Sequence, residues 1–339
     1  MNDLTAMIGI DLGGTNLRGG LVDDQERTIL ARARCATNGG EGAPGAVGDQ
    51  SPATVAARVA HLATQLLDEA DRAGLEVDAI GIGSPGPLDR LAGVIPETRN
   101  LGGGSWRDVQ FVALVRAALK NRLPVFLEND AICHLAGEFH AGAARGGRDM
   151  IMLTLGTGVG GAVMIDGKMH YGADGTAGHL GAMPLDIRDT QHRQSGFFGT
   201  LEALASAPAT AALALELLRA DPGTDSPLRA KMAAGLAAAD VARAAQEGCP
   251  IARRVWEQVG RVLGAAIATF VNSLNIDRAI VGGGAGAAWD LFAPAMLAEC
   301  RSRSWTTPFA RLTIVPAQLG DDAGLIGAAF LAQERADTL

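Results

Sequence analysis

Hydrophobic residues recur along the chain in two ways, at every second position as in a strand and at helical spacing. Near the start, Ile8, Ile10 and Leu12 alternate with other residues, Gly13 and Gly14 follow, and an extended pattern resumes over 17–22. This order predicts a strand, a glycine turn and a second strand. Short apolar runs predict further strands within 78–89 and 124–130, and apolar residues at helical spacing predict helices from 55 to Gly74 and over 108–122.

The second half begins with the same arrangement. Residues 150–168 again read as strand, glycine turn and strand, and Leu155 and Gly156 correspond to Leu12 and Gly13. Helices are then predicted over 209–220, 227–247 and 255–275, a strand within 277–286, a helix from 288, a strand over 312–317 and a closing helix over 319–334, capped by Asp321 or Asp322. Strands that alternate with helices predict an α/β fold, and the repeated hairpin suggests two related domains facing each other across a cleft.

Composition narrows the class of protein. The 339 residues carry a net charge of −8 and are 48% apolar, which excludes a disordered chain and leaves no basic surface for a nucleic acid. The longest apolar run, 262–271, is too short to cross a membrane, and the N-terminus shows no secretory signal. The four cysteines lie far apart, as expected of reduced thiols in a cytoplasmic protein.

Three glycine-rich turns that follow predicted strands are candidates for phosphate binding. Glycine lets the main chain approach a polyphosphate, and its free N–H groups can hold the anion. None of the turns matches a Walker or dinucleotide-binding pattern, and a single such turn is more often only a hairpin. Asp11, just before the first turn, is placed to hold Mg²⁺ beside the phosphates. The candidate phosphate-binding residues are Gly13, Gly14, Thr15, Asn16, Gly156, Thr157, Gly158, Gly283 and Gly284.

Asn129 and Asp130 form a second candidate constellation. They end a predicted strand, and in an open α/β sheet that position points toward the ligand. An aspartate there can accept the proton of a hydroxyl group that attacks a γ-phosphoryl group. Asp130 is equally suited to cap a helix that starts at Ala131. The two roles are compatible.

Six motifs together resemble the ROK family of repressors and sugar kinases, within the actin-like ATPases. They are IGIDLGGTNLRGGLVD, GIGSPGPLD, ENDA, LGTGVGGAVMIDGK, AIVGGG and LGDDAGLIGAA. The resemblance implies a two-domain actin-like, ribonuclease-H-like fold with an interdomain cleft, a small domain over 1–128 plus the helix at 322–339, and a large domain over 129–321. It also implies ATP, Mg²⁺ and a homodimer or homotetramer, with Asp130 as the catalytic base. The implied sugar-side residues are Gly86, Asn129, Asp130, His179 and Glu202.

The chain departs from the family pattern where the family binds a structural zinc ion. The usual A-G-E-x-G-H is AGHLGA here, so that His179 replaces a sugar-binding glutamate and Ala182 replaces a zinc-binding histidine. Arg193, Ser195 and Thr200 stand where the family has cysteines, and these residues are poor zinc ligands. We therefore expect no zinc, and a loop held by Phe197, Phe198 and Leu201. His179 is either a sugar contact or a buried histidine satisfied by the main chain, and the alternative for Glu202 is a carboxylate at a helix entry.

These features predict phosphoryl transfer from ATP to a hexose, with glucose at its 6-hydroxyl as the expected acceptor. The change at His179 leaves fructose, mannose or an amino sugar open, and polyphosphate remains open as a donor. A sugar-sensing regulator without activity is the alternative from another class, and an actin-like ATPase acting as a filament or chaperone is the third. The first hairpin begins by Ile8, which leaves no room for a preceding DNA-binding domain in this sequence.

Overall fold

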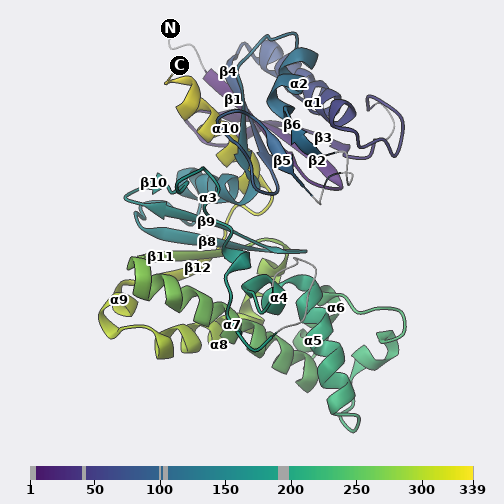
Figure 1. The fold of residues 1–339 in the computed structure, drawn as a ribbon, viewed down its shortest axis with the longest axis vertical. Coiled ribbons are helices and arrows are strands. Elements are labelled where there is room, and N and C mark those ends of the chain that lie inside the picture. Colours follow the sequence, from purple (N-terminus) through teal and green to yellow (C-terminus); the bar gives the residue numbers. More distant parts are fainter. Residues whose placement is uncertain (1–4, 40–42, 99–100, 102–105, 190–197, 339) are drawn as a thin grey trace. The chain divides into compact units, whose positions relative to one another are not determined.

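The computed structural model describes residues 5–39, 43–98, 101, 106–189 and 198–338, and the chain forms two compact units (Figure 1). The first unit comprises Met1–Gly146, Met169–Ala177 and Gln318–Leu339. The second comprises Gly147–Lys168 and Gly178–Ala317. Each unit has its own sheet and its own core, as the α/β prediction requires.

The first unit is built on a five-stranded sheet with the order β3-β2-β1-β4-β7. The strands are β1 (Thr5–Leu12), β2 (Asn16–Asp23), β3 (Ile29–Ala36), β4 (Glu76–Ser84) and β7 (Val125–Asn129), with a separate pair β5 (Ile95–Glu97) and β6 (Arg107–Val109). The helices are α1 (Pro52–Ala73), α2 (Phe111–Ala118), α3 (Asp130–Ala141) and α10 (Asp322–Ala336). Strands β1, β4 and β7 run parallel, so their carboxyl ends lie at one edge of the sheet.

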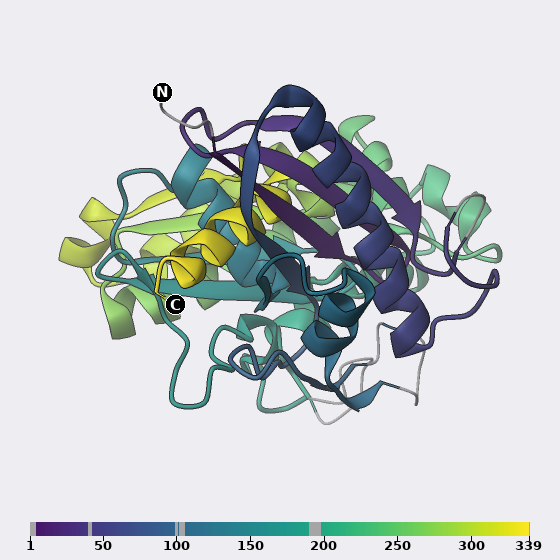
Figure 2. The ribbon, with the colours of Figure 1, turned by 90° about the horizontal axis from the view of Figure 1, so that it is seen from above.

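Helices cover both faces of this sheet, and the alternation along β1 shows how. Ile8 and Ile10 pack in the core that includes the apolar face of α1, whereas Met7 packs with Ile326 and Phe330 of α10. In Figure 2, α1 and the yellow α10 accordingly lie on opposite sides of the strands. A sheet buried on both faces explains why β1 and β4 are almost continuously buried.

The second unit is built on the sheet β10-β9-β8-β11-β12. Its strands are β8 (Met150–Leu155), β9 (Val159–Ile165), β10 (Lys168–Met169), β11 (Arg278–Gly282) and β12 (Thr313–Pro316). Its α-helices are α4 (Leu201–Ala205), α5 (Ala207–Ala220), α6 (Ala238–Gln246), α7 (Pro250–Leu274), α8 (Trp289–Arg303) and α9 (Thr306–Arg311), with short 3₁₀ turns η2 (Leu180–Ala182), η3 (Pro227–Lys231) and η4 (Gly284–Ala288). Alternate residues of β8, namely Ile151, Leu153 and Leu155, share a core with the buried face of α7.

The two sheets repeat one topology, as the duplicated hairpin predicted. In each, an antiparallel hairpin is extended by two parallel strands: β1-β2 by β4 and β7, and β8-β9 by β11 and β12. Each hairpin turn is three residues long, at 13–15 and 156–158. The prediction of two related domains is confirmed in this respect, and the α/β fold class is confirmed.

Two helix predictions were too long. The predicted helix over 108–122 is confined to α2, because Asp108, Lys120 and Asn121 adopt left-handed conformations that a helix cannot include. The predicted helix over 227–247 is interrupted because Gly235 has a φ of 95°, so only η3 and α6 form. The spacing of apolar residues does not reveal where a residue with positive φ ends a helix.

The first unit extends farther along the chain than the predicted boundary at residue 128. It continues to Gly146 because α3 packs against α10 and so belongs with the first sheet. The C-terminal helix joins the first unit, in agreement with the expected arrangement. No helix in the described ranges is both long and apolar enough to span a bilayer.

Candidate active site

The carboxyl ends of the three parallel strands bring the predicted first-unit site residues together. Asp11 on β1 is paired with Gly83 on β4, and Ser84 is paired with Asn129 on β7. The Asn129 side chain also donates from Nδ2 to the carbonyl oxygen of Gly86, at 3.3 Å. Asp11, Gly86, Asn129 and Asp130 are therefore neighbours at one edge of one sheet, which is where open α/β sheets bind ligands.

Asn129, not Asp130, caps helix α3. Its Oδ1 accepts the main-chain N–H groups of Ala131 (3.0 Å) and Ile132 (3.3 Å). The helix begins at Asp130 itself, so the expectation that Asp130 caps a helix starting at Ala131 was wrong. One oxygen of Asp130 does accept the N–H of Ala131, at 2.8 Å. Asn129 and Asp130 thus share the Ala131 N–H, and among the described residues no side-chain hydrogen bond reaches the second oxygen of Asp130.

The two aspartates at this edge hold their protons unusually strongly. The pKa of Asp130 is raised to about 6. Burial is the main cause and the charge of Asp11 adds to it, whereas His134 and the Ala131 N–H act in the opposite direction. Burial likewise raises the pKa of Asp11, while His134 and Arg18 lower it. A carboxyl group with a pKa near neutrality is well matched to removing a proton from an alcohol.

His134 is a part of this site that the sequence reasoning left without a role. It lies one turn after Asp130 on α3, and its Nδ1 donates to the main-chain carbonyl of Asp130, at 2.8 Å. This bond fixes the ring close enough to lower the pKa of both Asp11 and Asp130 by its positive charge. The i, i+4 spacing from Asp130 on a predicted helix was the available signal.

Replacement of His134 tests this electrostatic connection. We expect His134→Ala to raise the pKa of Asp130, because the substitution removes the positive charge that lowers it. The acidic limb of a plot of log kcat/KM against pH, expected at about 6 in the original protein, then moves to higher pH. His61→Ala, on α1, is the matched control and should leave the limb in place. A limb that stays fixed in His134→Ala would contradict this assignment.

Two hydrogen bonds of Gly13 fix the first glycine turn, which follows the end of β1. The Gly13 N–H donates to the carbonyl of Asn16 at 3.1 Å, and the Thr37 hydroxyl donates to the carbonyl of Gly13 at 2.6 Å. Thr15 and Asn16 are exposed. The turn is thus fixed by its carbonyl groups and presents exposed polar residues.

The second and third glycine turns lie together in the second unit. Gly283 has a φ of 83°, and a Cβ there would lie only 2.4 Å from the carbonyl oxygen of Leu155, which precedes the turn at 156–158. Only glycine satisfies both conditions. Gly156 closes its own turn by donating to the carbonyl of Gly158 at 2.9 Å, Thr157 is exposed, and a Cβ at Gly284 would meet no atom within 4 Å.

Glu202 supports this second turn. It lies in the first turn of α4, as the helix-entry alternative expected, and its Oε2 accepts the N–H of Val159 at 3.0 Å. His179 precedes η2 and is exposed, so the buried-histidine alternative was wrong. Glu202 and His179 therefore belong to the same unit as the second turn, and the other carboxylate oxygen of Glu202 is not used in that hydrogen bond.

The residues at the family's zinc positions do not fit a zinc ion where the structure describes them. Thr200 is buried and its hydroxyl accepts the N–H of Ala203, at 3.2 Å, as the cap of α4. Arg193, Ser195 and Phe197 lie outside the described residues. Leu201 is buried, as expected of a residue that holds the loop, whereas Phe198 is 44% exposed. Within the described ranges no three His, Cys, Asp or Glu residues form a metal-binding group.

A buried ion pair between Arg90 and Glu128 lies two residues before the predicted base, Asp130, and it was not predicted from the sequence. Glu128, 4% exposed, accepts from Arg90 Nε at 2.8 Å and from the Tyr171 hydroxyl at 3.0 Å. Its other oxygen accepts the N–H of Asn129, at 3.0 Å. The Arg90 guanidinium also stacks on the Tyr171 ring, 3.8 Å from its centroid. This network fixes the chain segment that carries Asp130, because it holds both Glu128 and the Asn129 main chain.

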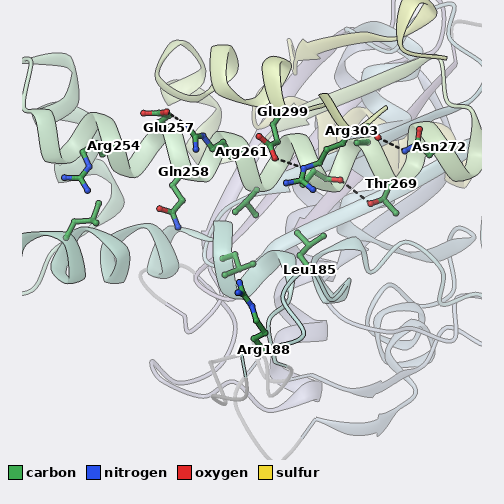
Figure 3. A pocket seen from close by; sticks show the side chains of 15 residues that line it. Leu185, Arg188, Arg254, Glu257, Gln258, Arg261, Thr269, Asn272, Glu299 and Arg303 are labelled. Carbon is green, nitrogen blue, oxygen red and sulfur yellow. Dashed lines mark hydrogen bonds and ion pairs between the residues drawn. The ribbon is translucent and has the colours of Figure 1, made fainter. Parts of the chain in front are cut away.

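A cavity of about 980 Å³ in the second unit is separate from these residues (Figure 3). It lies along α7 and α8, and charged side chains such as Arg261, Glu257 and Glu299 line it. Arg261 is paired with Glu257 across one helical turn, at 2.6 Å. None of the predicted site residues lines this cavity. Its size alone therefore does not make it the candidate active site.

Comparison with known proteins places the chain in a family. The model of the ROK family matches residues 7–335. The chain belongs to the ROK family. A glucokinase from Streptomyces coelicolor is 32% identical over 96% of this chain and 97% of its own length. An N-acetylmannosamine kinase from Salmonella arizonae is 30% identical over 98% of this chain and 99% of its own.

The solved structures agree with this membership. The crystal structure of a ROK family glucokinase from Streptomyces griseus, in complex with glucose and AMPPNP, has a TM-score of 0.78 and 29% identity. The match covers 97% of this chain and 99% of that one. The actin-like fold expected from the six motifs is therefore confirmed for this ROK protein.

Proposed function

We propose that this ROK protein transfers the γ-phosphoryl group of ATP to a hydroxyl group of a hexose, with glucose at its 6-hydroxyl as the first candidate. The main observation behind this proposal is Asp130 at the carboxyl edge of the first sheet, a carboxyl group whose pKa is raised to about 6 and which uses one oxygen to accept the Ala131 N–H. The similarity to glucokinases over nearly the full chain supports the substrate class.

Asp130 is the proposed base. Its ionised form would accept the proton of the sugar hydroxyl as the oxygen attacks the γ-phosphorus atom, and the bond from that phosphorus to the β-γ bridging oxygen would break. The α3 cap and the Glu128 network hold Asp130 in place before the substrate arrives. Such positioning is the main contribution that a protein makes to this reaction.

The glycine turns are the proposed nucleotide-binding elements. The N–H groups of Gly13 and Gly156 close the turns, so the other main-chain N–H groups of 13–16 and 156–158 would hold the phosphates. Gly283 and Gly284 would lie against adenosine. The residues fit a magnesium ion, because Asp11 is an oxygen ligand whose charge is poorly solvated and lies near that of Asp130. Mg²⁺ held by Asp11, directly or through water, would neutralise charge on the phosphates.

The sugar-side residues are proposed to be Gly86, Asn129, Asp130, His179 and Glu202. The first three lie at the edge of the first sheet, and the last two lie in the second unit beside β9. Closure over the sugar would exclude water from the reaction. The chain passes between the units at 146–147, 168–169, 177–178 and 317–318. We propose hinges at these passages in place of one near residue 128.

The acceptor can be tested with a panel of sugars. We expect ADP release, measured with ATP and Mg²⁺ in a coupled assay, to depend on added sugar and to be fastest with glucose. Fructose, mannose, N-acetylmannosamine and glucosamine complete the panel, because His179 is a weaker acceptor than the usual glutamate. Polyphosphate in place of ATP tests the donor.

Each outcome of this panel points to one class of function. Slow ADP release without sugar would indicate another actin-like ATPase, and sugar binding without ADP release would indicate a sensor. Preference for an amino sugar would retain the kinase and replace glucose. Metal analysis of the same preparation tests the expected lack of zinc, and light scattering tests the proposed homodimer or homotetramer.

A further inference from the structure

A second cavity in the first unit is lined by arginine side chains. It has a volume of about 440 Å³ and lies beside β7, between the loop at 90–93, the end of α2 and the end of α10. Small-molecule sites commonly have volumes of about 300–1,000 Å³. None of the residues assigned above to ATP or the sugar lines it. The cavity is therefore a separate candidate site in the same unit.

All the charged side chains that line this cavity are positive. Arg90, Arg116, Arg122 and Arg335 line the cavity, and no aspartate or glutamate does. Arg90 is paired with Glu128. Among the residues the structure describes, no carboxylate lies within ion-pair distance of the other three. Arg116, Arg122 and Arg335 thus form no ion pair among the described residues, although the charge of Glu128 partly offsets that of Arg335.

Arg335 is fixed in position, although no carboxylate holds it. Its Nη1 donates to the carbonyl of Arg90 at 3.0 Å and to that of Leu127 at 3.4 Å. Its guanidinium also stacks on the Phe126 ring, 4.6 Å from the centroid. Burial and the charge of Arg90 lower the pKa of Arg335. An anion in the cavity would relieve this unfavourable charge and meet a donor that is already oriented.

The cavity wall also offers apolar surface. Leu91 is 77% exposed and Val112 is half-buried, and both line the cavity together with the arginines. A large exposed leucine beside converging arginines suits a ligand that has both an anionic group and a carbon skeleton. Guanidinium groups bind phosphate through paired hydrogen bonds, and three of them suit a dianion better than a single carboxylate.

We propose that this cavity binds a small organic phosphate, with the phosphate group held by Arg116, Arg122 and Arg335 and the carbon skeleton against Leu91 and Val112. The cavity contains none of the residues proposed to contact ATP or the sugar, although Arg90 in its wall also pairs with Glu128. An acidic peptide is disfavoured because the cavity has a volume of only about 440 Å³.

Binding can be measured directly by calorimetry with ribose 5-phosphate as the probe and no ATP present. Arg335→Gln would also remove main-chain hydrogen bonds, so the principal variant is the double substitution Arg116→Gln with Arg122→Gln, at two exposed side chains. We expect its affinity for the probe to fall at least about tenfold, because it loses two charge-assisted contacts. Arg34→Gln, an exposed arginine on β3, is the matched control and should bind as the original protein does.

Hydrogen exchange locates the site within the chain. At saturating ribose 5-phosphate, we expect protection in segments 90–93 and 112–127 of the original protein and its loss in the double variant. Inorganic phosphate should protect the same segments more weakly, because it lacks the carbon skeleton. Unchanged affinity in the double variant, or no protection in these segments, would overturn the proposal and leave the kinase assignment untouched.

Discussion

Asp130→Asn is expected to reduce kcat by about a thousandfold, since general-base catalysis contributes roughly 10²–10⁴ to rates of this kind. Asparagine has nearly the same shape and still accepts the Ala131 N–H through its oxygen, but it cannot take a proton. The Asn129 cap is untouched, so α3 should form as before. Coupled ADP release at saturating glucose measures the loss, and nucleotide titration should give an unchanged Kd.

Stability separates the catalytic role of Asp130 from a structural one. Because burial raises its pKa to about 6, the ionised carboxylate destabilises the folded state at neutral pH, and this penalty grows as the pH rises from the ordinary aspartate value. The uncharged amide removes the penalty, so we expect Asp130→Asn to unfold at the same or a higher temperature. Asp68→Asn, exposed on α1, is the control and should retain full activity. Substantial turnover in Asp130→Asn would refute the base assignment.

The sequence predicted the framework because strands and glycine turns are local signals. Alternating apolar residues and the repeated L-G-x turn were sufficient to place both hairpins, and short apolar runs placed β4, β7, β11 and β12 along the chain. The breaks in the predicted helices could not be seen in the sequence. Asp108 and Lys120 adopt left-handed conformations, but aspartate and lysine also occur commonly within helices. Backbone conformation at such points is set by packing on both sides of the chain.

The sequence predicted those site residues that can be recognised from their own position in the chain, but not those that depend on partners distant in sequence. Asp130 and Asn129 stood out because polar residues at a strand end are informative, although which of them caps α3 depends on main-chain geometry. Glu128 was missed because its partners, Arg90 and Tyr171, are distant in sequence and meet it only in the folded unit. Arg58 shows the same limit: it falls on the apolar face of α1, yet is fully buried and donates to main-chain carbonyls including those of Thr37 and Pro44.

Gly327→Ala is expected to have the largest effect on stability, because α3 and α10 are in direct contact there. A Cβ at Gly327 would lie 1.8 Å from the carbonyl oxygen of Cys133 and 2.6 Å from the nitrogen of Gly137, both in the main chain of α3. Neither atom can move without shifting a helix. Such overpacking costs about 3 kcal/mol, and the better helix propensity of alanine offsets about 1 kcal/mol of this. We expect a net loss of about 2 kcal/mol in the free energy of unfolding, measured by urea titration.

The same substitution should reduce activity, because α3 begins at Asp130. A shift of the helix displaces the carboxylate from the attacking hydroxyl, and misplacement by about 1 Å can cost roughly a hundredfold in rate. Gly223→Ala is the matched control, since a Cβ there meets no atom within 4 Å, and it should change neither stability nor kcat. If Gly327→Ala lost stability but kept full kcat, the packing of α10 on α3 would be structural only, and the position of Asp130 would depend instead on the Asn129 cap and the Glu128 network.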